Sequence, residues 1–144
     1  MKRLAALLAL LAPIAALPAD PPPFQAHVDM QTFMEHVLTP AAAIVWRVNG
    51  TIIDQRGEHD LSPKTDADWE GVVSGAATLA EAVNALMIPS RALDDQWNFY
   101  ALKLAAAADE AYRAAERHDL KTISGVSDRL DGICSACHRH YGYE

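Results

Sequence analysis

The sequence predicts an all-α protein built as an antiparallel four-helix bundle. Four segments repeat apolar residues at alternating steps of three and four, which places one apolar stripe on each predicted amphipathic helix. The connection between the second and third segments is about seven residues long, and the third and fourth are joined by a tight turn. Short connections of this kind favour antiparallel neighbours.

The first helical segment covers residues 30–48 and contains Pro40 in its interior. A proline has no amide hydrogen to donate, and its ring crowds the carbonyl group four residues earlier. We therefore expect a kink there, or a new helix that begins with Thr39 as its cap. Asn49-Gly50 can supply the left-handed residue that ends the segment. Its apolar stripe consists of Met30, Met34, Val37, Ala41, Ile44 and Val48.

The other three segments each begin near a residue that can cap a helix. Thr65 or Asp66 precedes the second segment, Asp94 the third and Asp119 the fourth. A short side chain with an oxygen atom accepts a hydrogen bond from an amide that the helix itself leaves without a partner. The three stripes consist of Trp69, Val72, Ala76, Leu79, Val83 and Leu86, then Trp97, Ala101, Leu104, Ala108, Ala111 and Ala115, and then Ile123, Val126, Leu130, Ile133 and Cys137.

The connection between the first and second segments, residues 50–64, is long and polar. We expect a loop that is long enough to run the length of the bundle. The sequence contains no internal repeat.

The N-terminal residues 1–19 have the pattern of a secretory signal peptide. Lys2 and Arg3 precede an apolar run over residues 4–17, and small residues and prolines follow it. The run of 14 residues is shorter than the roughly 20 that cross a bilayer, so stable membrane insertion is not expected. Residues 20–144 would then form one exported domain.

The exported chain is acidic. Removing Lys2 and Arg3 leaves 10 basic residues against 19 acidic ones, a net charge of about −9. This charge disfavours nucleic acid as a partner and favours encounters with a protein that has a basic docking face.

The residues that carry chemistry are concentrated in one motif, Cys134-Ser135-Ala136-Cys137-His138, which holds the only two cysteines of the chain. On a helix, positions i, i+3 and i+4 share one face, so both thiols and the imidazole can point at one flat object. Two thiols that add to the two vinyl groups of a haem would hold the porphyrin, and the adjacent imidazole would reach the iron. We therefore predict one covalently bound haem c with His138 as an axial ligand.

Two alternatives to haem attachment stay open for the motif. A disulfide between Cys134 and Cys137 would leave a haemless helical bundle. A zinc site would need two more ligands at recognisable spacing, whereas the other five histidines are scattered and no second pair of cysteines exists.

The predicted helices and the position of the motif resemble the class II cytochromes c, which comprise the cytochrome c-prime group and its low-spin, methionine-ligated relatives. The resemblance rests on four helices, a C-x-x-C-H motif on the last of them near the C-terminus, and an aromatic residue three positions after the histidine, here Tyr141. It covers the whole exported chain. It implies a left-handed antiparallel bundle with the haem between the helices, Cys134 and Cys137 as the thioether positions, and His138 as the axial histidine.

The same resemblance places the sixth ligand of the iron on the core face of the first helix, where this chain has Met34, with Met30 one turn earlier. A methionine on an apolar stripe is also ordinary core filling. His36 is two residues from Met34 and therefore points about 200° away around the helix. The family commonly has an arginine at the position of Met30, so the haem carboxylates lack their expected partner here, and Arg91 and Arg129 are the candidates to replace it.

These expectations together indicate a periplasmic electron carrier with one haem, His/Met axial ligation and no enzymatic activity. The alternative is a five-coordinate, cytochrome c-prime-like protein that binds nitric oxide or carbon monoxide. A peroxidase is disfavoured, because the stripe of the first helix offers no histidine or arginine for acid–base chemistry.

Three further expectations concern packing. The polypeptide by itself should have a cavity between the first, third and fourth helices. Trp46, Trp69 and Trp97 should fill the core or form a wall of the haem site. The sequence leaves the oligomeric state open, although the resemblance allows a homodimer through the first two helices, where alanines 41–43 would permit close packing.

Overall fold

The computed structural model describes residues 24–143, and most of them are helical. The predicted signal peptide, residues 1–19, lies outside the described residues. None of the helices within residues 24–143 is both long and apolar enough to cross a membrane. In chain order the elements are α1 (Met30–Phe33), a π-turn (Met34–Leu38), α2 (Thr39–Trp46), a 3-10 turn (Arg47–Asn49), β1 (Thr51–Asp54), β2 (Gly57–Asp60), α3 (Asp66–Val83), a second 3-10 turn (Asn84–Leu86), α4 (Asp95–Glu116) and α5 (Leu120–Tyr141).

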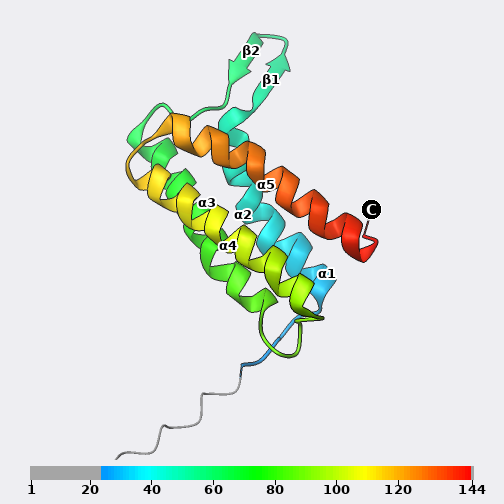
Figure 1. Cartoon of the computed structure of the whole chain (residues 1–144). Coiled ribbons are helices and arrows are strands. Elements are labelled where there is room, and N and C mark those ends of the chain that lie inside the picture. The colour runs from blue at the N-terminus through cyan, green and yellow to red at the C-terminus, as the bar shows by residue number, and fades with distance from the viewer. Residues whose placement is uncertain (1–23, 144) are drawn as a thin grey trace, which may run out of the picture.

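Four helical segments lie side by side around one apolar core, because α1, the π-turn and α2 follow one another as a single segment (Figure 1). In this core α3 packs against α2 and α4, and α5 packs against α4 and α2. All the predicted stripe residues of α3 and α4, including those of the 3-10 turn after α3, are buried. On the other two segments six stripe residues are only half-buried. Three of them, Met34, Ile133 and Cys137, line the cavity described below, and the others are Met30, Val37 and Ile44.

Three of the predicted helix caps are confirmed. The side chain of Thr65 accepts a hydrogen bond from the amide of Asp68, whose carboxylate accepts in return from the amide of Thr65 at 2.9 Å. The carboxylate of Asp94 accepts from the amide of Trp97, and Asp119 caps α5 in the same way. Each bond satisfies an amide that the first turn leaves without a helical partner.

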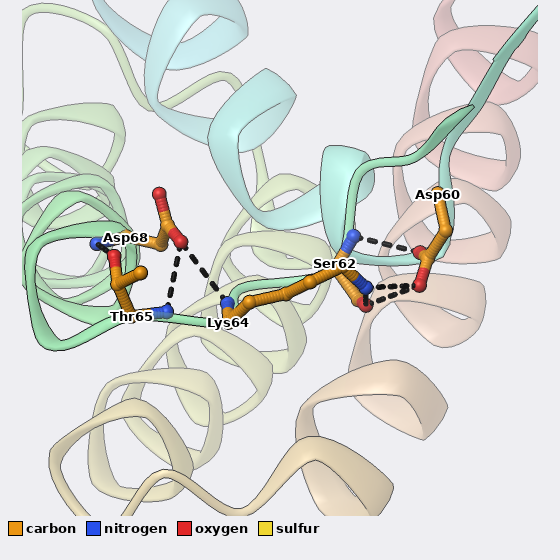
Figure 2. A network of polar contacts seen from close by, with 5 residues as sticks. All are labelled: Asp60, Ser62, Lys64, Thr65 and Asp68. Atoms are coloured by element: carbon orange, nitrogen blue, oxygen red, sulfur yellow. Dashed lines mark hydrogen bonds and ion pairs between the residues drawn. The ribbon is translucent and has the colours of Figure 1, made fainter.

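The start of α3 is also tied to the end of β2 (Figure 2). The Lys64 ammonium group donates to Asp60 at 2.6 Å, and the amide of Lys64 donates to Asp68 at 3.1 Å. Asp60 also accepts from the amide and the hydroxyl group of Ser62. These bonds lower the pKa of the Asp60 carboxyl group, with the Lys64 bond as the largest cause.

The polar connection after α2 is a β-hairpin, so the prediction of a purely helical protein is wrong there. Asp54 lies opposite Gly57 in the antiparallel register, and its carboxylate accepts a hydrogen bond from the amide of Arg56 at 2.7 Å. Gly57 has a φ of +119°, which a residue without a β-carbon adopts readily. The amide of Leu61 donates to the carbonyl of Gly50 at 2.9 Å, so the chain returns to the point where it left α2. The hairpin projects from one end of the helices instead of running along them (Figure 1).

Pro40 is accommodated by a π-turn and not by a new cap. Leu38 and Thr39 keep helical dihedral angles, and neither side chain caps α2. The amide of Thr39 donates to the carbonyl of Met34, five residues earlier, which is the hydrogen bond of a π-helix. The predicted restart with Thr39 as cap is therefore wrong, because the wider turn lets the helix continue past the residue that has no amide hydrogen.

The segments α2 and α3 approach each other closely at Gly75. A β-carbon built on Gly75 would lie 2.6 Å from side-chain atoms of Ile44. Ala41 and Ala42 are buried within the same chain, so these two alanines are not free to pack against a second copy as the sequence suggested.

Candidate functional site

Four of the residues singled out from the sequence meet at one cavity between the helical segments. Met34 lines it from the π-turn, and Cys134, Cys137 and His138 line it from α5. The wall between them is formed mainly by apolar side chains of α2 and α4. None of the described residues that line this cavity is an aspartate, glutamate, lysine or arginine.

The cavity is open on one side and narrow inside. The space between its atoms, including the open mouth, is about 650 Å³. The centre of a water molecule can move through only about 80 Å³ of that space. A flat group much larger than water would therefore enter only if wall side chains rotate or the helices separate slightly.

The helical spacing of α5 brings both thiols and the imidazole to the cavity. Cys134 and Cys137 are half-buried, and their sulfur atoms are not bonded to each other. The helix ends just beyond them, where Gly142 adopts a φ of +73° and its amide donates to the carbonyl of His138. Within residues 24–143, no group of three or more His, Cys, Asp or Glu side chains is arranged to hold a metal ion, so the zinc alternative finds no ligand set.

Both cysteine side chains are held as thiols. Burial raises the pKa of Cys134 to about 11, with smaller contributions from the nearby Asp131 and Cys137. Burial also raises the pKa of Cys137. Since the thiolate is the nucleophilic form of cysteine, these side chains react slowly on their own at neutral pH.

The raised pKa of Cys134 predicts that the haem-free protein loses stability at high pH. The unfolded thiol ionises near its usual pKa of 9.0, whereas the folded thiol ionises near 11. The contribution of this group is therefore fully present below pH 9 and is lost as the pH rises through 11. Chemical unfolding of the haem-free chain at pH 8 and pH 10.5 measures the loss.

The matched control for this prediction is the variant Cys134→Ser. It should show a smaller loss of stability between the two pH values, because other groups that titrate in this range stay in place. Equal losses in the two proteins would contradict the raised pKa of Cys134.

A network of hydrogen bonds fastens the last turn of α5 to the start of α4. The carboxylate of Asp94 accepts from the Trp97 amide at 2.7 Å and from the Tyr141 hydroxyl group at 2.6 Å. The indole nitrogen of Trp97 donates to the carbonyl of Leu86 at 2.8 Å, and the Trp97 and Tyr141 rings meet edge to face at 5.3 Å. The Tyr141 bond is the largest cause of a lowered Asp94 pKa. This network fixes the position of the α5 turn that carries His138 relative to the cavity wall formed by α4.

The three tryptophans divide between the cavity and the core. Trp46 and Trp97 line the cavity, whereas Trp69 is buried elsewhere and stacks on the ring of His118 at 4.9 Å. The indole nitrogen of Trp46 is buried and has no hydrogen-bond partner among residues 24–143. Spacing along the sequence did not distinguish these roles.

The structure separates the two candidate methionines. Met34 lines the cavity, whereas Met30 lines a different groove, which shares Trp97 with the cavity. His36 is not among the cavity residues, and 73% of its side chain is exposed. Arg129 forms an ion pair with Glu110.

Sequence reasoning missed two polar cavity residues, Thr39 and Tyr100. Tyr100 follows Trp97 by three residues and so lies on the same side of α4, beside the apolar stripe and not on it. This position beside the stripe is the sequence feature that could have identified Tyr100 as a cavity residue.

No protein family model, curated protein or solved structure matches this chain.

Proposed function

We propose that this protein is a c-type cytochrome of the class II kind, an antiparallel four-helix bundle that carries one covalently bound haem and transfers single electrons in the periplasm. The observation that carries the proposal is the convergence of Cys134, Cys137, His138 and Met34, from segments far apart in the sequence, on one apolar cavity. Its redox partner would present a basic face to the acidic surface. The signal peptide at residues 1–19 supports export from the sequence alone.

The residues at the cavity fit a haem by their chemistry. Two thiols match the two vinyl groups, while an imidazole and a thioether are the axial ligands of many cytochromes c. The apolar wall would exclude water from the metal, and low polarity around a haem is one of the properties that set its reduction potential. The indole N–H of Trp46, which lines this cavity, is buried without a hydrogen-bond partner among residues 24–143.

Each residue then has a distinct task. The thiols of Cys134 and Cys137 would hold the haem through two thioether bonds, each made by the addition of an S–H group across a vinyl double bond. Because both thiol pKa values are raised, we expect this addition to need a dedicated maturation system. When bound, the haem supplies an iron that gains and loses one electron.

The axial residues and their supports govern that electron transfer. His138 would bind the iron from α5, and its position is held by the bond between Tyr141 and Asp94. Met34 would approach from the first helical segment, and a thioether ligand raises the reduction potential.

A second candidate function is the binding of nitric oxide or carbon monoxide. It is favoured by the apolar lining of the cavity, which would leave the iron open to a diatomic gas if Met34 does not bind it. The Met34 substitution described in the Discussion distinguishes the two.

Mass spectrometry of the exported protein tests the haem proposal directly. We expect a coloured protein whose mass equals that of the processed chain plus one haem, when it is produced with a working cytochrome maturation system. The variant Cys134→Ser/Cys137→Ser should be exported without covalent haem. A colourless wild-type protein lacking two hydrogens would instead show the disulfide and would end the proposal.

A further inference from the structure

The cavity contains no positive charge for the carboxylate groups of a haem. A haem carries two carboxylates, and a buried carboxylate without a cation or several hydrogen-bond donors is strongly disfavoured. Among the described residues that line the cavity, only hydroxyl, indole, thiol and imidazole groups are polar. The carboxylates would therefore extend out of the cavity, toward water or a cation outside it.

A groove next to the cavity holds such a cation. Trp97 lines both the cavity and this groove, and Met30 and Arg91 form part of the groove's wall. Met30 lies one helical turn before Met34, so the groove adjoins the end of the cavity where Met34 lies.

Arg91 differs from every other described lysine and arginine, because it alone is not exposed. One guanidinium nitrogen donates to the carbonyl of Val28 at 2.8 Å, and the guanidinium group lies 4.3 Å from the centre of the Phe33 ring. A weaker bond of 3.4 Å reaches the carbonyl of Ala85.

Arg91 has no ion-pair partner among the described residues, although Asp29 also lines the groove. The Nε atom of Arg91 is buried without a partner, and no carboxylate within residues 24–143 lies within 4.0 Å of its nitrogens. A half-buried guanidinium group without a carboxylate partner is unfavourable unless an anion accepts from it, and the planar guanidinium group matches a carboxylate well.

We propose that Arg91 binds a carboxylate of the haem held in the cavity. This inference rests on the proposed function and adds the residue that orients the cofactor and keeps its carboxylate ionised. Arg91 lies in the connection between α3 and α4 and lines the same groove as Met30. It would therefore supply the positive charge that the first helical segment lacks at Met30.

The competing explanation is that Arg91 only joins the chain at Val28 and Ala85. The dependence of the midpoint potential on pH separates the two, since a purely structural arginine would not change it. Without its cation, the carboxylate would take up a proton in the mildly acidic range, and loss of that negative charge near the iron raises the potential.

The experiment compares haem-loaded wild type, Arg91→Gln and the control Arg129→Gln between pH 5 and pH 8. We expect a nearly constant potential for wild type and the control, and a potential that rises on acidification for Arg91→Gln. Equal pH profiles in all three proteins would overturn the proposal. A wild-type chain without haem would instead refute the proposed function, and this inference with it.

A second measurement applies if Arg91→Gln does not fold. Hydrogen exchange at an Arg91 Nη–H, followed by NMR, should be slower in the haem-loaded wild type than in the haem-free Cys134→Ser/Cys137→Ser variant. Arg91→Lys, which keeps the charge, identifies the signal by its loss. Equal exchange rates with and without haem would show that no carboxylate accepts from this atom.

Discussion

From the proposed ligation by His138 and Met34, we expect Met34→Ala to change the ferric haem-loaded protein from low-spin to high-spin. Met34 lines the cavity together with His138, so its thioether can complete the coordination of the iron, whereas an alanine side chain has no donor atom. The absorption spectrum of the ferric protein reports the change, including loss of the weak sulfur-to-iron band. The reduced variant should also gain the ability to bind carbon monoxide.

The matched control is Met30→Ala, on the same helical segment. Met30 lies in the neighbouring groove and not in the cavity, so this variant should keep the low-spin spectrum. Loss of a partly buried methionine side chain should lower stability in both variants. Only Met34→Ala should also remove a ligand of the iron and so change the spectrum.

Three outcomes of this comparison have separate meanings. Unchanged spectra in Met34→Ala would refute Met34 as a ligand. A low-spin spectrum that is lost only in Met30→Ala would assign the ligand to Met30. A wild-type ferric protein that is already high-spin, and whose reduced form binds carbon monoxide, would favour the gas-binding candidate over electron transfer.

The second large effect is expected at Gly75, where α2 and α3 touch. A β-carbon on Gly75 would meet Ile44 at 2.6 Å, a distance that requires one segment to move. Overpacking of this kind costs about 1–3 kcal/mol, and the better helix propensity of alanine offsets at most about 1 kcal/mol. We therefore expect Gly75→Ala to lower the free energy of unfolding of the haem-loaded protein, as measured by denaturant titration.

Gly71 provides the control one turn earlier on α3. A β-carbon there meets nothing within 4 Å, so Gly71→Ala should raise the free energy of unfolding by about 0.5–1 kcal/mol. The added substitution Ile44→Ala should recover part of the loss in Gly75→Ala, because residues in contact do not contribute independently. Equal stabilisation by both alanines would show that the close approach of α2 to α3 relaxes without cost.

The helices could be predicted from the sequence because their causes are local. A stripe at steps of three and four selects one face of a helix, and Thr65, Asp94 and Asp119 accept bonds from amides only a few residues away. The hairpin was not predicted because its strands are short and exposed. The features that favour it are the Asp54 side chain in the turn and the dihedral angle of Gly57. The π-turn was not predicted either. Pro40 indicates that the helix is disturbed, but several kinds of distortion can accommodate a proline in a helix.

The candidate site, too, has a part that follows from local sequence and a part that depends on the tertiary structure. By itself, the sequence determined that Cys134, Cys137 and His138 lie on one face of a helix, because i, i+3 and i+4 positions coincide for any α-helix. Only the tertiary structure decided which residues of the other segments accompany them. It placed Met34 in the cavity and Met30 outside it, and brought Arg91 to the neighbouring groove. These choices depend on how helices pack over long sequence separations, and spacing within a single helix carries no information about that packing.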